Sequence, residues 1–410
     1  MPDQTPPADL EITILRGMSE VAPSEWDAIA GADDPFSDHA FLDALERSES
    51  VGAGTGWMPR HVAVRQGGRL VGAVAAYKKD DSWGEFTFDF HWARAAQQAG
   101  IRYFPKLVAM TPFTPATGTR LLIAEDADRD VVLAALAKGL RQAADELGAS
   151  SIHALYLSEP ERRGLLAAGD FMPRLSTQFH FLNQDDAGQP HPSFEAFLAR
   201  MRSPARKQIR RERREVATSS HRVEVKEGAT LTDRDWKALH VFYRMNAARH
   251  GAFGYLTPAC FDILRETFAH RVLAVLAYDG DEPVAGSLNF EKGACLYGRY
   301  WGTTIDAEFL HFECCYHRLI ERAIEQGYRR VEAGAQGHHK IKRGLLPAEI
   351  HSVHWLRDPR LARAVAEFLP EEAHAVRMEM ADLEAAGPFR RDRGEGDAPS
   401  LPDAPGDPEK

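Results

Sequence analysis

Two glutamates occupy positions where a carboxylate could take up a proton. Glu313 falls in a helix predicted at about residues 309–325 and shares an apolar face with Phe312 and Tyr316. Burying a carboxylate costs on the order of several kcal/mol unless it is paired or protonated. The position therefore favours a general base, or else a structural carboxylate bonded to Tyr316 or to an arginine. Glu332 ends a predicted strand, where ligands of open α/β sheets bind, and its alternative is likewise structural. Both are catalytic candidates.

The loop after that strand combines glycines with ionisable side chains. Gly334 and Gly337 would let backbone N–H groups approach an oxyanion or a phosphate, although a plain turn is the alternative. We expect Gln336 and Gly337 to contact substrate. His339 could act as a base near neutral pH, and Lys340 could hold a phosphate or a carboxylate.

A second candidate base, His311, lies two residues before Glu313 on a more polar face of the predicted helix. Together with His339, Glu313 and Glu332 it could be interpreted as a metal site. Their spacing matches no common set of metal ligands, so we expect no metal.

The strand expected before this helix carries Arg299, Tyr300 and Trp301. Strict alternation would place Arg299 and Trp301 on one face and Tyr300 on the other. An arginine beside a tryptophan suits a phosphate or a stacked base, and core packing is the alternative for Trp301. We expect all three residues to bind substrate.

One short segment concentrates positive charge in a chain that is acidic overall. It carries eight basic residues, namely Arg200, Arg202, Arg206, Lys207, Arg210, Arg211, Arg213 and Arg214. On a helix, Arg206, Arg210, Arg213 and Arg214 share one face, with Lys207 and Arg211 beside it. These six residues could bind phosphate or nucleic acid, possible partners including tRNA, because such segregation focuses positive potential. The alternative is a solvated helix whose charges pair with surface carboxylates.

The elements that must position these residues repeat along the chain. Strands are expected at 61–65, 70–77, 151–157 and 175–182, with helices at 130–147 and 161–168. The second half repeats this order, with strands at 272–278, 283–290, 328–333 and 351–356. The sequence Arg-Gly-Leu-Leu at 163–166 recurs at 343–346, and two helix-closing glycines, Gly148 and Gly327, stand at nearly the same offset. The pattern predicts two similar α/β domains.

Length and composition agree with this division. At roughly 150 residues per domain, 410 residues suggest two or three domains. We expect domains at 10–185 and 222–370, a basic helical linker at 193–219 and a C-terminal helix at 371–386. Residues 1–9 and the Pro-rich tail at 387–410 are expected to be disordered, a PxxP ligand being the alternative for the tail. A net charge of −10 argues against a general polyanion binder but leaves room for a local basic site.

Nothing in the sequence indicates export or a membrane span. Residues 1–15 lack a basic region followed by an apolar run, and no stretch reaches the ~18 uncharged apolar residues that a span needs. The four cysteines form no Cys-x-x-Cys pair, which argues against a zinc site and fits free thiols in a reducing compartment. We expect a cytoplasmic protein.

Several longer motifs are more specific than these patterns. They lie at 35–42, 55–57, 84–89, 103–107 and 112–115, and again at 297–302 and 334–340. Over about residues 33–370 the chain resembles the FemAB-like family of predicted N-acyltransferases, named for peptidoglycan biosynthesis or recognition. That family resembles the GNAT superfamily, so the resemblance implies tandem duplicated GNAT-like domains with mixed central sheets, joined by the basic segment. Asp89 and Lys106 lie in matching segments of the first half and are expected to shape the acceptor side.

The resemblance implies transfer of an acyl group to an amine more firmly than it implies a donor. Fem enzymes use aminoacyl-tRNA, whereas most GNAT enzymes use acyl-CoA, so either could be the co-substrate, with no tightly bound cofactor. The expected acceptor is an amine-bearing small molecule or peptide, attacked directly because the chain carries no recognisable covalent nucleophile motif. The alternative is a non-catalytic module that recognises cell-wall peptide or RNA.

Overall fold

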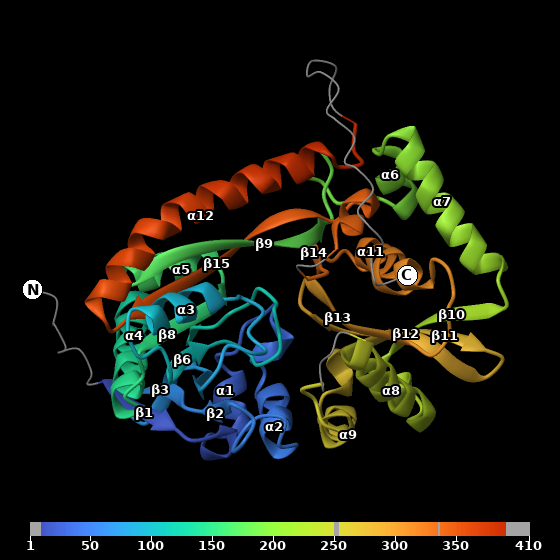
Figure 1. The fold of residues 1–410 in the computed structure, drawn as a ribbon. Coiled ribbons are helices and arrows are strands. Elements are labelled where there is room, and N and C mark those ends of the chain that lie inside the picture. The colour runs from blue at the N-terminus through green and yellow to red at the C-terminus, as the bar shows by residue number, and fades with distance from the viewer. Residues whose placement is uncertain (1–9, 250–253, 335–336, 391–410) are drawn as a thin grey trace, which may run out of the picture. The chain divides into compact units, whose positions relative to one another are not determined.

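The computed structural model describes residues 10–249, 254–334 and 337–390 (Figure 1). The chain forms two compact units. The first comprises Met1–Ser176, Tyr255–Thr267 and Ile350–His374, and the second comprises Thr177–Gly254, Phe268–Glu349 and Ala375–Lys410. Both units therefore use segments from both halves of the sequence, unlike the continuous ranges 10–185 and 222–370 expected above. Residues 1–9 and, of the predicted tail at 387–410, residues 391–410 lie outside the described residues. The expected disorder is wrong for residues 387–390, where the carbonyl oxygen of Pro388 accepts the N–H of Arg202 at 2.8 Å.

The first unit is a mixed α/β structure whose strands pair in a regular order. β1 (Leu10–Leu15), β3 (His61–Gln66) and β4 (Arg69–Val74) pair antiparallel, and β7 (Leu122–Ile123) flanks β4. β2 (Trp57–Pro59), β5 (Ala76–Lys79) and β6 (Lys106–Ala109) also pair antiparallel, and β6 is parallel to β8 (Ser151–Leu157). β8 then pairs antiparallel with β15 (Leu346–Leu356), a strand from the far end of the chain.

Helices of the first unit bury their apolar faces against these strands. The helices are α1 (Pro23–Asp27), α2 (His39–Arg47), α3 (Phe90–Gln98), α4 (Arg129–Glu146), α5 (Glu159–Ala167) and α9 (Pro258–Thr267). Asp128 caps α4 by accepting hydrogen bonds from two backbone N–H groups of its first turn. Gly139 lets α4 approach β3, since a Cβ there would lie 2.3 Å from Val62. Buried side chains of α4, β1, β3, β4 and β8 belong to one hydrophobic core.

The second unit repeats the strand order of the first. β10 (His221–Glu227), β11 (Val272–Asp279), β12 (Glu282–Lys292) and β13 (Cys295–Thr303) pair antiparallel in succession. β13 is parallel to β14 (Arg330–Glu332), which pairs antiparallel with β9 (Met172–Leu182). In the first unit β1, β3, β4 and β7 form a sheet separate from that of β2, β5, β6 and β8, whereas β10–β13 belong to one sheet. Both units nevertheless have antiparallel pairs, one parallel pair and a final strand taken from the other half of the sequence, as duplicated domains with mixed sheets predict.

The helices of the second unit include the predicted basic segment. They are α6 (Phe194–Ala199), α7 (Ser203–Thr218), α8 (Asp233–Arg249), α10 (Leu310–Phe312), a π-helical turn η5 (Glu313–His317) and α11 (Arg318–Glu325). A short 3₁₀ segment, η6, covers His338–Arg343. Ile209, Glu212 and Val216 form the buried face of α7, so its basic side chains lie on the remaining faces.

Three expectations about local structure are wrong. The helix at 309–325 is not continuous, because the π-helical turn η5 interrupts it. The C-terminal helix, α12 (Pro359–Ala385), begins well before residue 371 and continues through Pro370. Alternation along β13 is interrupted at Arg299, because Leu288 pairs with Tyr300 and Asn289 with Gly298. The Arg299 guanidinium lies 5.3 Å from the Tyr300 ring centre.

We predict that β13 tolerates no side chain at Gly302. A Cβ there would lie 2.1 Å from the carbonyl oxygen of Phe242 on α8. Gly302→Ala should therefore lower the free energy of unfolding by about 1–3 kcal/mol, measured by urea denaturation. Gly298→Ala is the control in the same strand, since its nearest neighbouring atoms lie 3.4 Å away. Equal stability of the two variants would contradict this packing.

Candidate functional site

A cluster of rings in the second unit brings two of the predicted catalytic residues together. The Tyr316 hydroxyl and His339 Nε2 are 2.9 Å apart and share a hydrogen bond. The His311 ring centre lies 5.3 Å from that of Tyr316, 5.8 Å from that of His339 and 5.2 Å from that of Trp301. Phe312 packs against His311 and His339. We call these five residues the Tyr316 cluster, and it can hold and move a proton.

The π-helical turn explains why Tyr316 belongs to this cluster and Glu313 does not. In a π-helical turn each hydrogen bond joins residues i and i+5 instead of i and i+4, so the turn contains one extra residue. Side chains three positions apart in the sequence therefore no longer lie on one face. Burial, and after it the charges of His339 and Lys340, lowers the pKa of His311 to about 3. His311 is therefore a neutral ring at physiological pH.

The position of His339 depends on a buried ion group. Arg343 donates to both oxygens of Glu212, at 3.1 Å and 2.6 Å, and to the carbonyl oxygen of His339 at 2.8 Å. Its guanidinium lies 3.3 Å from the Phe312 ring centre. Gly337 allows the approach of the His339 ring, because a Cβ there would lie 2.3 Å from the imidazole.

Glu212 is compensated by a second partner as well. His317 Nε2 lies 2.9 Å from its carboxylate. Burial would raise the pKa of Glu212, but the hydrogen bond with His317 and the charge of Arg343 outweigh it and hold the pKa below its usual value. The carboxylate is thus charged at neutral pH, and it joins α7 to η5 and η6.

Glu313 lies in a different ion group from the Tyr316 cluster. Its carboxylate oxygens are 2.7 Å from Arg318 Nε and 3.4 Å from Arg213 Nε. Both arginines also pair with Glu321. The predicted apolar environment of Glu313 is therefore wrong, and the observed contacts correspond to its structural alternative, a carboxylate bonded to arginines.

Glu332 is also buried among charged and polar side chains. Arg330 lies 2.9 Å from one carboxylate oxygen, and His180 Nε2 lies 3.8 Å from the other. Lys340 is buried, 5.9 Å from the Phe179 ring centre. Gln336 lies outside the described residues.

The basic residues of α7 divide into several environments. Arg210 pairs with Glu195, Arg211 with Glu215 and Arg213 with Glu321. Arg206 donates to the carbonyl oxygen of Met201, while Lys207 and Arg214 are exposed.

A cavity of about 560 Å³ lies beside α7. Its basic lining residues are Arg210, Arg213, Arg214, His221, Arg222 and Arg318, and its acidic ones are Glu195 and Glu313. Arginines from α7, β10 and α11 therefore meet at one cavity, which could accept an anion. Arg222 and Arg318 escaped the sequence analysis because they lie outside the basic run.

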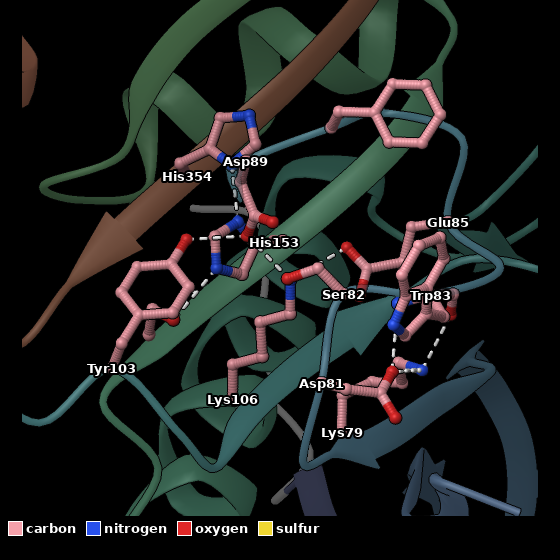
Figure 2. A network of polar contacts seen from close by, with 12 residues as sticks. Lys79, Asp81, Ser82, Trp83, Glu85, Asp89, Tyr103, Lys106, His153 and His354 are labelled. Atoms are coloured by element: carbon pink, nitrogen blue, oxygen red, sulfur yellow. Dashed lines mark hydrogen bonds and ion pairs between the residues drawn. The ribbon is translucent and has the colours of Figure 1, made fainter. Parts of the chain in front are cut away.

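In the first unit, Asp89 and Lys106 belong to a buried polar network (Figure 2). Lys106 Nζ donates to Ser82 Oγ at 3.0 Å, to Glu85 at 2.9 Å and to Asp89 at 2.6 Å. Tyr103 donates its hydroxyl hydrogen to Asp89. Both predicted substrate-binding side chains are inaccessible to solvent, so they position the surrounding loop.

Two histidines with strongly perturbed titration lie near this network. His153 Nδ1 and His354 Nδ1 are 2.7 Å apart, on the paired strands β8 and β15. Burial, and after it the charge of Lys106, lowers the pKa of His153 to about 3. Burial also raises the pKa of Glu85 to about 7, against the opposing charge of Lys106. Glu85, His153 and His354 were not predicted, because their partners are distant in sequence.

A model of the FemAB-like family, described as peptidoglycan biosynthesis/recognition, matches residues 17–391. The chain belongs to the FemAB-like family, which confirms the resemblance found in its motifs. The description of the family covers biosynthesis, which agrees with the expected acyltransferase, and also recognition. No curated protein sequence matches the chain.

Two solved structures show the same fold at low sequence identity. The crystal structure of FemX has a TM-score of 0.52 and 12% identity, covering 84% of this chain and 98% of that one. A conserved protein of unknown function from Bacteroides thetaiotaomicron VPI-5482 has the same TM-score and identity, covering 84% and 100%. These likenesses confirm the expected fold class, tandem GNAT-like domains.

Two kinds of feature are absent from the described residues. None of their helices is both long and apolar enough to cross a bilayer. Within the same ranges, no group of three or more histidine, cysteine or acidic side chains is arranged to hold a metal ion.

We predict that Glu85 makes stability fall as pH rises from 5 to 8. Its pKa in the folded protein, about 7, exceeds the ordinary value of 4.5, so the folded state binds more protons in this window. Glu85→Gln should remove this loss. The difference in unfolding free energy, variant minus unsubstituted protein, should therefore become more positive by about 2–3 kcal/mol between pH 5 and pH 8. Urea denaturation at each pH measures this difference. A difference that stays constant with pH would contradict the assignment.

Proposed function

We propose that this protein is an N-acyltransferase that moves an acyl or aminoacyl group from an activated donor to an amine, by direct attack. The observation that carries the proposal is the Tyr316–His339 hydrogen bond, which lies within the ring cluster beside β13. π-Helical turns frequently occur at functional sites, and here η5 supplies the tyrosine. Trp301 and His311 lie around the Tyr316–His339 pair and contribute an apolar ring and an uncharged ring, respectively.

In the proposed reaction the amine nitrogen attacks the carbonyl carbon of the donor, and the bond from that carbon to sulfur or oxygen breaks. His339 takes the proton that the amine loses. Tyr316 donates its hydroxyl proton to the departing thiolate or alkoxide, and His339 restores that proton through the hydrogen bond they share. Proton loss and gain balance, and no covalent enzyme intermediate forms.

The donor would bind through its phosphates. Both acyl-CoA and aminoacyl-tRNA carry phosphate, and the arginine-lined cavity beside α7 offers a site for one. Glu313 would position Arg213 and Arg318 there instead of acting as the base. β13 continues to Thr303, but only its residues Cys295–Tyr297 pair with β14. The donor would lie along the part of β13 beyond Tyr297.

The acceptor would be an amine-bearing small molecule or peptide. The description of the family, peptidoglycan biosynthesis/recognition, supports an amine of a cell-wall peptide. We further propose a cytoplasmic location and assign the reacting site to the second unit. Asp89 and Lys106, which are buried, would act on the acceptor side by positioning the loop around them.

We predict that Tyr316→Phe and His339→Gln each lower kcat by about 10²–10⁴-fold, because both remove the proton relay. The rate of acyl transfer is measured with excess donor. The double variant should be little worse than either single one, since the two residues act as one unit. Tyr328→Phe is the control, removing a hydroxyl that contacts Glu291 and Arg322.

Full activity in both single variants would contradict the proton relay. If the unsubstituted protein transfers no acyl group but binds cell-wall peptide or RNA, the alternative holds, a non-catalytic module whose binding Glu313→Gln and Glu332→Gln should leave unchanged. In the enzyme, Glu313→Gln should instead weaken donor binding, because Glu313 positions Arg213 and Arg318.

Donor identity is tested by titrating the protein with acyl-CoAs and with charged tRNA at two salt concentrations. A tRNA donor should bind with an affinity that falls steeply with salt, and Arg214→Ala with Arg222→Ala should reduce that slope. A CoA donor should bind without competition from tRNA. Binding of either donor that both substitutions leave unchanged would contradict the cavity assignment.

A further inference from the structure

One segment of the first unit turns its polar side chains inward and its aromatic side chains outward. The buried polar residues are Ser82, Glu85, Thr87 and Asp89. The exposed aromatic residues are Trp83, Phe86, Phe88 and Phe90, with exposed fractions of 61%, 38%, 47% and 40%. A surface loop in water ordinarily has the opposite arrangement. We call residues 82–90 the aromatic loop.

Buried cations hold the loop in this conformation (Figure 2). Lys106 binds three of its inward side chains, as described above. Lys79, itself fully buried, donates to Asp81 Oδ1 and to the carbonyl oxygen of Trp83, both at 2.8 Å. Asp81 Oδ1 also accepts the N–H of Trp83 at 2.9 Å. The exposed indole is therefore attached to a fixed backbone.

The rest of the loop is held by side chains from β8 and β9. Tyr156 donates to the carbonyl oxygen of Glu85 at 2.9 Å, and Arg174 donates to that of Phe88 at 3.0 Å. Phe86 has a φ of 58°, a left-handed conformation that a bulky residue adopts only when its surroundings impose it. The outward direction of the rings is thus built into the fold.

The rings form a patch instead of standing singly. The Phe90 ring centre lies 5.4 Å from that of Trp83 and 5.5 Å from that of Phe88, with the two phenylalanine rings stacked. Next to Phe90, His91 packs against Phe368, which is also exposed. Partly exposed rings of this size sum to on the order of 300–400 Å² of apolar surface, the size of patches that mark interaction sites.

We propose that the aromatic loop is a docking surface for a lipid interface. Protruding tryptophan and phenylalanine rings partition into the boundary between head groups and acyl chains, which adapts to their shape without a matching pocket. The charged side chains around the patch are paired, Lys78 with Asp80, Lys79 with Asp81 and Arg174 with Glu372, so the patch offers little net charge to a charged partner. The binding is apolar, and it occurs without anionic lipid. This proposal does not depend on the acyl transfer proposed above.

The test is co-sedimentation of the full-length protein with phosphatidylcholine vesicles at 0.1 and 0.5 M salt. The triple variant Trp83→Ser, Phe88→Ser, Phe90→Ser should bind at least ten-fold more weakly. A matched control replaces three exposed apolar side chains elsewhere, Val131, Leu182 and Met378, with serine and should change binding less than two-fold. Thermal unfolding checks that both variants remain folded.

A second measurement locates the contact without weakening it. Lipids brominated in their acyl chains should quench tryptophan fluorescence in the unsubstituted protein. Trp83→Phe should remove most of this quenching while retaining vesicle binding, because the variant keeps an apolar ring.

Four results would overturn the proposal: no binding to vesicles, binding that the triple variant retains, binding only to anionic vesicles that high salt abolishes, or quenching unchanged in Trp83→Phe. Loss of self-association in the triple variant, seen by light scattering without vesicle binding, would assign the loop to an interface between copies of the chain.

Discussion

The buried carboxylate of Glu212 is the interaction on which the second unit's site depends. A buried charge must be compensated, and removing one partner of such a pair costs about 3–5 kcal/mol. Arg343 and His317 supply that compensation, and Arg343 also holds the backbone of His339 and the ring of Phe312. The contact between Tyr316 and His339 is therefore a consequence of how the charge of Glu212 is satisfied.

The same constraint organises the first unit around a cation. Lys106 is fully buried, so it must collect hydrogen-bond acceptors, and it takes them from the loop that carries Ser82, Glu85 and Asp89. Once those polar side chains turn inward, the aromatic residues between them are left outside. A single buried ammonium thus determines the surface chemistry of the loop.

Much of the fold could be predicted from local sequence patterns. The strand at 151–157 occurs at the predicted residues, and the helix at 130–147 matches α4 within one residue at each end, because periodicity and capping are local signals. The interruptions were not predictable in this way. The π-helical turn at Glu313 and the bulge at Arg299 each add a residue within a regular element, and tertiary packing decides whether that addition is tolerated.

The sequence by itself determined the family, the duplicated α/β fold and the residues that carry charge or titrate, since these follow from motifs and residue types. Tertiary structure alone decided which of those residues meet. It separated Glu313 from Tyr316, joined Tyr316 to His339, and paired Glu212 with an arginine 131 positions away. The reason is physical: hydrogen bonds and ion pairs depend on distances of a few ångströms, and those distances are set by the packing of elements from distant parts of the chain.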